Sequence, residues 1–386
     1  MNSSLSCKHV LITIPVLLIG GTELQTLNLV RVLLSAAYQV TVCCYHEYDQ
    51  DMVSQVEATG ARVSLMGLDR SDGIVSLVGK LKTVFRELNP DIVHVQYVAP
   101  GFLPILVARL AGVKTIFGTV HQPGRTYGWK AKVLLRSAAK LCTAFFCVSE
   151  STEKSWFGES EVFDPDKGNK RRSHFTIYNA VDIKTVEDSI AKVDPDELRK
   201  SIGVEGSKAI GIVARLRREK GHAFLFGAMS EVIKKVPDAV LLVVGDGPDR
   251  EKLKGQAENI GIADNVIWLG QKNPEDVYKL YSIMDVVAVP SLFEGFGLSA
   301  AEAMAAGVPL VGTRVDGLTE IIEDGVSGYL VAAGDTKSLA QCLMNLLSEP
   351  EKAKAMGQKG QEIVKERFSM ERFDKSIRSL YERYGG

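Results

Sequence analysis

The chain has 386 residues, of which 46% are hydrophobic, and its 46 Lys and Arg nearly balance its 47 Asp and Glu. This length is typical of two domains, and the composition excludes an intrinsically disordered chain. A dedicated duplex-DNA-binding protein has a strongly basic domain, so the net charge of −1 argues against a nucleic-acid partner. The six cysteines have no CxxC spacing, which argues against a zinc site and favours reduced thiols.

The first apolar run, residues 10–19, is interrupted by Thr13 and Pro15. It is too short to span a bilayer, which needs about 20 apolar residues. It also lacks the basic flank and small-residue cleavage site of a signal peptide. We therefore expect a cytoplasmic protein.

Short apolar runs alternate with helical patterns along the first half of the chain. Thr22 and Gln25 have the spacing of a capping box at the start of the first helix. The predicted strands are residues 10–18, 39–44, 61–65, 91–95, 115–120, 144–148 and 175–178, and the predicted helices are residues 22–34, 74–88 and 103–111. This alternation predicts a parallel, doubly wound sheet.

A second series of the same kind follows. Its predicted strands are residues 209–213, 239–244, 266–269, 286–289 and 310–312, and its predicted helices are residues 223–236, 276–283, 299–306, 339–347 and 362–384. We expect an α/β protein with a first domain over 1–185, a second over 186–365 and a C-terminal helix over 366–386 that packs back towards the first domain. Open parallel sheets bind ligands at the carboxyl ends of their strands, although the fold alone does not define the function.

The strongest local signal is the segment from Glu294 to Pro309, EGFGLSAAEAMAAGVP. A strand leads into a glycine-containing loop, and a helix begins near Ser299. Loop amides and a helix N-terminus bind anions such as phosphate. Glu294 in the loop and Glu302 in the first turn of the helix could both accept hydrogen bonds from sugar hydroxyls. However, Ser299-x-x-Glu302 is also the spacing of a capping box, and the spacing leaves both interpretations open.

Two further segments carry candidate chemistry near strand ends. Arg215 follows the strand at 209–213, and Lys220 opens the next helix, where two cations suit a diphosphate. A solvated basic turn is the alternative. His121 follows the strand at 115–120, where a ligand contact is expected, although a lone histidine is more often structural. The chain contains no GxGxxG, GxxxxGK[ST], GxSxG or HExxH motif.

Taken in order, these segments resemble the retaining glycosyltransferases of family 4, which have the two-domain GT-B fold with a central cleft. Arg215 and Lys220 match the donor-diphosphate pair, and Glu294 and Glu302 match the E-x7-E motif. The remaining matching segments are Gly20–Glu23, Cys147–Ser149, Tyr178–Asp182, Gly317, Glu320 and Asp324–Leu330.

The resemblance implies a nucleotide-diphosphate sugar as donor, with no cofactor and no metal. It implies that His121, Arg215, Lys220 and Glu294 act at the reacting sugar and the leaving diphosphate. The implied donor-binding residues are Gly21 at the phosphate, Gly270 near the base, the backbone amides of Phe296, Gly297 and Leu298, Glu302 at the ribose, and Glu320. The chain departs from the family pattern at Gln122-Pro123, where an acid or glycine is frequent, and at Asp316-Gly317, where a glycine pair is common.

The acceptor side shows a charge pattern of its own. Residues 92–149 contain no Asp or Glu, and residues 129–141, WKAKVLLRSAAKL, form a basic amphipathic helix. We hypothesise that this helix contacts an anionic membrane surface. The residues on which this hypothesis depends are Trp129, Lys130, Lys132, Arg136 and Lys140. A solvated helix whose lysine stems cover the core is the alternative.

The resulting functional hypothesis is retaining transfer of a sugar to a glycan or lipid-linked acceptor hydroxyl, by a cytoplasmic protein with a peripheral membrane contact. The alternatives are a synthase-type transferase with a soluble sugar acceptor and a catalytically silent GT-B scaffold subunit. Counted from the sequence, residues 1–185 carry 20 basic and 16 acidic residues, and the remainder carries 26 and 31. This asymmetry supports separate tasks for the two domains: the second would hold the donor nucleotide, and the first would meet the acceptor and a membrane surface.

Overall fold

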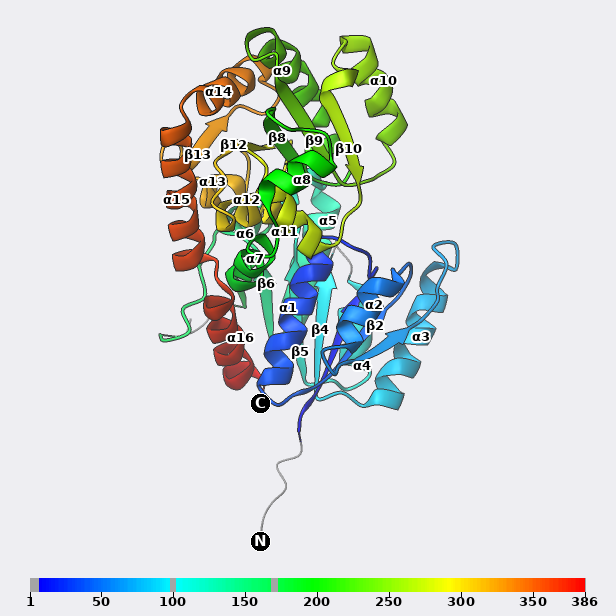
Figure 1. Cartoon of the computed structure of the whole chain (residues 1–386). Helices are drawn as coiled ribbons and strands as arrows, with labels where there is room; N and C mark the ends of the chain where they lie inside the picture. The colour runs from blue at the N-terminus through cyan, green and yellow to red at the C-terminus, as the bar shows by residue number, and fades with distance from the viewer. Residues whose placement is uncertain (1–6, 98–101, 168–172, 386) are drawn as a thin grey trace. The chain divides into compact units, whose positions relative to one another are not determined.

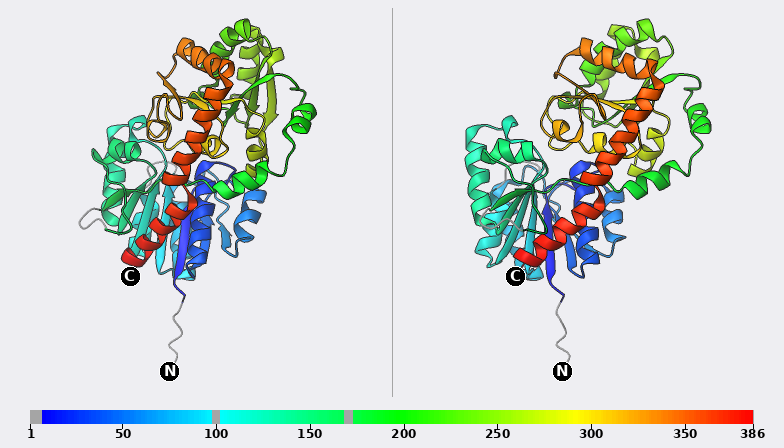
Figure 2. Two further views of the ribbon diagram at one scale, coloured as in Figure 1. Left: turned by 60° about the vertical axis from the view of Figure 1, so that its left-hand side comes forward. Right: turned by 90° about the vertical axis from the view of Figure 1, so that its left-hand side faces the viewer.

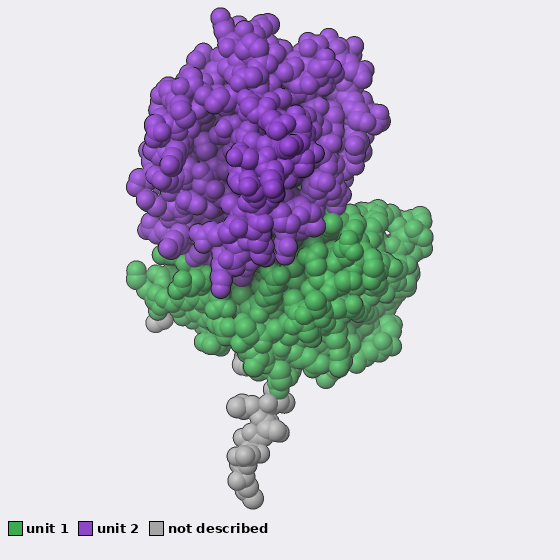
Figure 3. Space-filling view, in the orientation of Figure 1, with its two compact units in different colours: residues 1–180, 371–386 green, residues 181–370 purple. Residues whose placement is uncertain are grey.

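The computed structural model describes residues 7–97, 102–167 and 173–385. The chain forms two compact units, coloured separately in Figure 3. Unit 1 comprises Met1–Ala180 with Glu371–Gly386, and unit 2 comprises Val181–Met370. The structural boundary thus lies between Ala180 and Val181, a few residues before the expected one at 185–186.

Unit 1 is built on a seven-stranded parallel sheet in the order β3-β2-β1-β4-β5-β6-β7 (Figure 1). Its strands are β1 His9–Ile14, β2 Gln39–Cys44, β3 Arg62–Leu65, β4 Ile92–Tyr97, β5 Thr115–Val120, β6 Ala144–Cys147 and β7 His174–Thr176. Its helices are α1 Gly21–Ser35, α2 Gln50–Glu57, α3 Gly73–Leu88, α4 Leu103–Leu110, α5 Trp129–Leu141, α6 Glu150–Phe157 and α16 Met370–Tyr384.

Unit 2 repeats this plan with a six-stranded parallel sheet in the order β10-β9-β8-β11-β12-β13. Its strands are β8 Lys208–Val213, β9 Ala239–Val244, β10 Val266–Gly270, β11 Val286–Val289, β12 Leu310–Thr313 and β13 Gly328–Val331. Its helices are α7 Ile183–Ile190, α8 Pro195–Ser201, α9 His222–Lys235, α10 Arg250–Ile260, α11 Pro274–Tyr281, α12 Leu298–Ala305, α13 Leu318–Ile321, α14 Thr336–Ser348 and α15 Pro350–Arg367. The predicted α/β fold with two doubly wound sheets is confirmed.

Each sheet is covered by helices, which explains the nearly continuous apolar runs of its strands. In unit 1, Leu11 and Ile116 from the sheet pack with Trp156 of α6 in one buried cluster. In unit 2, Ile210 of β8 packs with Phe226 of α9 and Leu343 of α14. In each sheet the strand order reverses at one point, between β1 and β4 and between β8 and β11. Open α/β sheets bind ligands at such switch points.

The last part of the chain consists of two helices rather than the single predicted helix 362–384, because α15 ends at Arg367 and α16 begins at Met370. Figure 2 shows α16, in red, beside the sheet of unit 1. The Tyr381 hydroxyl of α16 lies 2.7 Å from Nδ1 of His94, a buried residue of β4. The Tyr381 ring also packs edge-on against Phe117 of β5, with ring centroids 4.9 Å apart. These buried contacts hold the C-terminal helix on unit 1.

The start of α1 differs from the prediction. The helix begins at Gly21, its N-cap is Gly20, and no side chain caps it, so the expected capping box of Thr22 and Gln25 is wrong. Gln25 instead donates a hydrogen bond to the Ala180 carbonyl (2.8 Å) and accepts one from the Ala180 amide (3.0 Å). A tertiary contact with a residue far along the chain takes the place of the local one.

Candidate active site

The loops that leave the carboxyl ends of β8 and β9 are held together by glycines. A Cβ atom on Gly245 would lie 2.0 Å from the Ala214 carbonyl oxygen, and one on Gly247 would lie 2.5 Å from that of Leu216. The Leu216 amide donates to the Asp246 carbonyl at 3.0 Å. The segment that carries Arg215 is therefore held by the turn at 245–247, which the sequence motif alone did not indicate.

Lys220 and Glu294 meet at the switch point of unit 2. The Lys220 ammonium lies 2.7 Å from Oε2 of Glu294, and the Ser291 hydroxyl donates to the same oxygen at 3.1 Å. The two side chains are only 26% and 15% exposed. Lys220 ends a 3-10 turn, Arg218–Lys220, and α9 starts at His222, so the expectation that Lys220 opens the helix is wrong.

Backbone contacts hold the loop after β8 against the loop after β11. Gly221 has φ +74° and approaches Pro290 so closely that a Cβ atom would lie 1.9 Å from the Pro290 carbonyl oxygen. The Leu292 amide donates to the Glu219 carbonyl at 2.8 Å. The loop after β8 is thus joined to the loop after β11 on both sides of Lys220.

Helix α12 begins at Leu298, four residues after Glu294. The N-cap is Gly297, in the left-handed region at φ +103°, and no side chain caps the helix. Ser299 is therefore not the cap, and the capping-box interpretation of Ser299 and Glu302 is wrong. The first amides of a helix, here from Leu298 onward, have no helical carbonyl to bond to and can hold an anion. Phe296 is buried, with its ring centroid 5.4 Å from that of Phe368.

Glu302 lies in the second turn of α12 rather than in the first, and its side chain is buried. Burial raises the pKa of the Glu302 carboxyl to about 8, and hydrogen bonds from the Tyr281 and Tyr278 hydroxyls offset part of this effect. Both tyrosines belong to α11. At neutral pH the carboxyl group is therefore mostly protonated.

The raised pKa of Glu302 predicts a pH-dependent stability. The folded-state pKa of about 8 exceeds the ordinary value of 4.5. The contribution of the Glu302 carboxyl to the free energy of unfolding is therefore full below about pH 4.5 and is lost as pH rises through 8. We expect Glu302→Gln to gain free energy of unfolding relative to the wild type between pH 5.5 and 8, by at most roughly 1.4 kcal/mol per pH unit. Urea unfolding at both pH values measures this difference.

The matched control for this prediction is Glu351→Gln, at an exposed position of α15. The free energy of unfolding of this control should differ from that of the wild type by the same amount at both pH values. A Glu302→Gln difference that does not change with pH would show that Glu302 titrates like an exposed carboxyl.

Asp316 and Gly317, which depart from the glycine pair common in the family, have a structural role that the sequence did not indicate. Asp316 lies in the left-handed region at φ +33°, and its carboxylate accepts a hydrogen bond from the Glu294 amide at 3.2 Å. The Gly317 amide donates to the Glu294 carbonyl, also at 3.2 Å. The loop after β12 therefore holds the backbone of Glu294 from both sides, and Glu320 follows in the short helix α13.

The remaining predicted donor contacts lie at other strand ends. Gly270 ends β10 at φ +69°, and its carbonyl accepts a hydrogen bond from the Gly245 amide at 2.8 Å. Gly21, by contrast, lies in unit 1, as the first residue of α1 after β1. Within residues 7–97, 102–167 and 173–385, no cluster of three or more His, Cys, Asp or Glu could hold a metal ion.

His121 of unit 1 directly follows β5, as predicted, and Nε2 of its ring lies 2.7 Å from Oε1 of Gln96. Burial lowers the pKa of His121 to about 4, so the ring is neutral at pH 7. The unusual Gln122 that follows is anchored, because its side chain accepts a hydrogen bond from the Tyr127 hydroxyl. Its carbonyl also accepts one from the Trp156 indole at 2.7 Å.

The basic helix α5 packs on unit 1 through Leu135, Ala138 and Ala139. Its outer face exposes large apolar side chains: Trp129 is 71% exposed, Val133 53% and Leu134 49%. Lys130, Arg136 and Lys140 are also exposed, whereas Lys132 is half-buried. The Arg136 guanidinium donates to the Trp156 carbonyl at 2.7 Å, so part of its hydrogen-bonding capacity is used within the unit.

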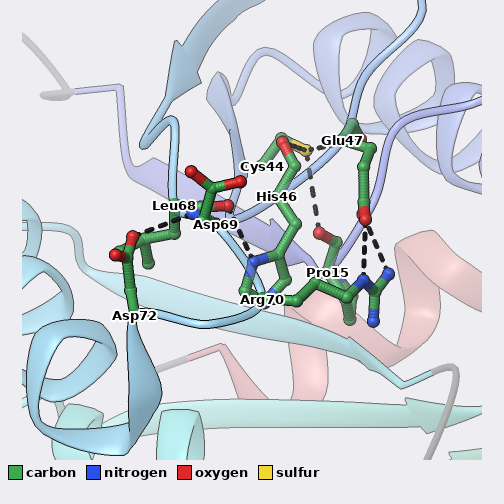
Figure 4. Close-up of polar contacts among 8 residues, drawn as sticks. All are labelled: Pro15, Cys44, His46, Glu47, Leu68, Asp69, Arg70 and Asp72. Carbon is green, nitrogen blue, oxygen red and sulfur yellow. Dashed lines mark hydrogen bonds and ion pairs between the residues drawn. The ribbon is translucent and has the colours of Figure 1, made fainter.

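A polar cluster lies at the carboxyl ends of β2 and β3 in unit 1, and no motif indicated it. Figure 4 shows the Arg70 guanidinium facing the Glu47 carboxylate, with two hydrogen bonds of 2.7 and 2.8 Å. These bonds lower the pKa of Glu47 to about 2. Nδ1 of His46 lies 3.0 Å from the Leu68 carbonyl, and the Asp72 carboxylate accepts a hydrogen bond from the Asp69 amide at 2.8 Å.

Comparison with known families assigns both units. Residues 194–363 match the family "Glycosyl transferases group 1", and residues 19–160 match "Glycosyltransferase Family 4". The first match contains Arg215, Lys220, Glu294 and Glu302, and the second contains Gly21, His121 and all of α5.

Individual relatives agree with these matches. The chain is 31% identical over 313 residues to N-acetyl-alpha-D-glucosaminyl L-malate synthase of Bacillus anthracis, covering 80% of this chain and 78% of the relative. It is 28% identical over 302 residues to the GDP-mannose-dependent alpha-(1-6)-phosphatidylinositol monomannoside mannosyltransferase of Mycolicibacterium smegmatis, covering 74% of each chain.

Among solved structures, HepE of Anabaena in complex with UDP-glucose superposes with a TM-score of 0.80 at 21% identity. The superposition covers 97% of this chain and 99% of HepE. At this identity the likeness supports the fold.

Proposed function

The chain belongs to glycosyltransferase family 4, and from this we propose that it transfers a sugar, with retention of configuration, from a nucleotide-diphosphate sugar to an acceptor hydroxyl. The observation that carries the proposal is the contact between Lys220 and Glu294 at 2.7 Å, at the switch point of unit 2. It brings a cation for phosphate and a carboxylate for hydroxyls to one place, beside the N-terminus of α12. HepE, which has the same fold, was solved with UDP-glucose.

The donor would be held by unit 2. We assign the diphosphate to Lys220, Arg215 and the first amides of α12, because cations and helix N-termini bind anions. The backbone amides of Phe296, Gly297 and Leu298 would contact the diphosphate and the sugar. The remaining donor contacts are assigned by family resemblance: Glu294 to the sugar hydroxyls, Glu302 to the ribose, Gly270 to the vicinity of the base, and Glu320, Gly21 and His121 to the rest of the donor.

The chemical step needs no protein nucleophile. The bond between the anomeric carbon and the diphosphate oxygen breaks, and the acceptor oxygen bonds to that carbon on the same face. The acceptor proton passes to the leaving diphosphate, so that a glycoside and a nucleoside diphosphate result. Lys220 and Arg215 stabilise the negative charge that grows on the leaving group, which is electrostatic preorganisation.

The acceptor is proposed to be a glycan or a lipid-linked molecule. The relatives' names support two acceptor classes, because one relative is named for synthesis of N-acetyl-alpha-D-glucosaminyl L-malate and the other for mannosyl transfer to a phosphatidylinositol monomannoside. The exposed apolar and basic face of α5 favours the lipid class, since such faces bind anionic membrane surfaces. In the described part of the chain no helix has the length and apolar character needed to cross a bilayer.

If α5 contacts the membrane, reversing its positive charges should weaken the binding of the protein to anionic vesicles. Replacing both Lys130 and Lys140 by Glu should weaken binding to vesicles rich in phosphatidylserine by about 30-fold, at about 1 kcal/mol for each lysine removed. Vesicle flotation at low and high salt measures this effect, because salt screens the attraction.

The matched control reverses Lys352 and Lys359 of α15, which changes the net charge equally. We expect this control to float like the wild type. Equal binding by both double variants, or binding that does not depend on salt, would contradict the membrane contact and favour a soluble acceptor.

Donor turnover separates an enzyme from a silent scaffold subunit. Glu294→Ala should lower the rate of transfer or donor hydrolysis about 10–100-fold, since hydrogen bonds to a charged group contribute about 1.5–3 kcal/mol. Proton NMR of the anomeric signal follows the turnover and shows whether the configuration is retained. The proposed activity would be contradicted if the wild type turned over no nucleotide sugar, as is expected of a silent scaffold subunit.

A further inference from the structure

His121 and Gln96 come from neighbouring parallel strands of unit 1. Gln96 of β4 is paired with Thr119 of β5, and His121 follows the end of β5. The Gln96 side chain is buried, and its Oε1 lies 2.7 Å from Nε2 of His121. An amide oxygen can only accept a hydrogen bond, so Nε2 of His121 carries the hydrogen.

The surroundings of His121 favour the uncharged ring. Burial lowers the pKa of His121 to about 4, and no carboxylate among the described residues contributes to the shift. His94 of β4 is the titratable neighbour that interacts with it, and burial lowers the pKa of His94 to about 3. The His94 nitrogens are themselves occupied, at 2.7 Å each, by the Tyr381 and Thr119 hydroxyls.

We propose that Gln96 is a positioning residue that holds His121 as the neutral tautomer with hydrogen on Nε2. This tautomer leaves Nδ1 as an acceptor for the donor-sugar contact that the family resemblance assigns to His121. This role rests on the proposed function of the chain. The advantage of this tautomer is that the imidazole ring of His121 carries no charge. Positive charge develops at the anomeric carbon as the leaving group departs, and an imidazolium nearby would oppose it.

Gln96 is suited to this task because it is neutral. A glutamate in its place would accept the same hydrogen bond, but its charge would favour the imidazolium and raise the pKa of His121 by about 1–3 units. Gln96→Glu should therefore lose kcat/KM about tenfold per pH unit below the new pKa of His121 and recover at higher pH. Gln96→Met keeps the size but removes the acceptor, so we expect it to lower kcat at every pH.

The test that does not depend on activity is the tautomer of His121. In protein labelled with ¹⁵N-histidine, two-bond ¹H–¹⁵N spectra distinguish the two neutral tautomers from the imidazolium. His121→Asn identifies the signal among the six histidines. We expect the Nε2–H pattern in the wild type from pH 6 to 8, a mixture of tautomers in Gln96→Met, and a larger imidazolium fraction in Gln96→Glu than in the wild type near pH 5. Thermal melting confirms that each variant is folded.

Three results would overturn the proposal. The first is an Nδ1–H or charged His121 in the wild type, and the second is a tautomer that stays unchanged in Gln96→Met. The third is a shifted tautomer with kcat/KM within twofold of the wild type. Failure of the proposed function would look different, because the wild type would transfer no sugar while the Nε2–H signal remained.

Discussion

Replacing Lys220 by methionine is expected to lower kcat about 10²–10³-fold, which is the usual effect of removing a preorganised group that stabilises transition-state charge. Lys220 is held at 2.7 Å from Glu294 by loops that meet on both sides of it, so its ammonium group needs little reorganisation at the moment of reaction. Because the negative charge of the diphosphate increases as the sugar leaves, kcat should fall more than KM rises. Steady-state transfer rates at saturating and limiting donor measure both quantities.

Two variants control this prediction. Lys220→Arg retains the positive charge and should recover part of kcat, although a planar guanidinium does not replace a compact ammonium fully. Lys234→Met removes an exposed lysine of α9 in the same unit and should leave kcat unchanged. If Lys220→Met changed only KM, the lysine would bind the ground state and the transition state equally, contrary to its assigned role.

Replacing Gly221 by alanine is expected to cost about 2–5 kcal/mol in the free energy of unfolding. The residue has φ +74°, where an L side chain costs roughly 1–2 kcal/mol. In addition, the new Cβ atom would lie 1.9 Å from the Pro290 carbonyl oxygen, and overpacking costs typically 1–3 kcal/mol. Urea unfolding measures the loss, and donor turnover should also fall because Lys220 precedes the displaced residue.

Gly261→Ala is the matched control for this prediction. Gly261 follows α10 at φ +79° in the same unit, but a Cβ atom there would have no neighbour within 4 Å. The control should therefore lose only the backbone contribution of roughly 1–2 kcal/mol. Equal losses in the two variants would show that the contact between the β8 and β11 loops is not tight.

The sheets could be predicted from sequence because their signal is local. Residues 239–244, AVLLVV, are apolar throughout, as expected for a strand covered on both faces, and helical periodicity between such runs indicates parallel crossovers. Strand β13 was missed, since Gly328–Val331 is short and follows a turn-rich segment. The positions of Arg215, Lys220 and His121 after their strands followed from the same pattern.

The environment of these residues could not be predicted, because tertiary contacts determine it. Gln25 has the spacing of a cap but bonds to Ala180, which lies 155 positions along the chain. Glu302 occupies a place defined by two tyrosines of α11, and its raised pKa follows from burial that no spacing reveals. Gln96 and Asp316 belong to no motif, and their roles follow from the strand or loop that packs beside them.

Nucleotide-sugar binding by unit 2 is the central claim, and a thermal unfolding screen of the whole chain tests it most directly. Wild type and Lys220→Met are melted with uridine, guanosine and adenosine diphosphate sugars over a range of concentrations. A donor present at 100 times its Kd should stabilise the wild type by about 2.7 kcal/mol, and most of this gain should be lost in Lys220→Met. Stabilisation of neither protein by any donor, or equal stabilisation of both, would contradict the assignment of the donor site to Lys220 and Glu294.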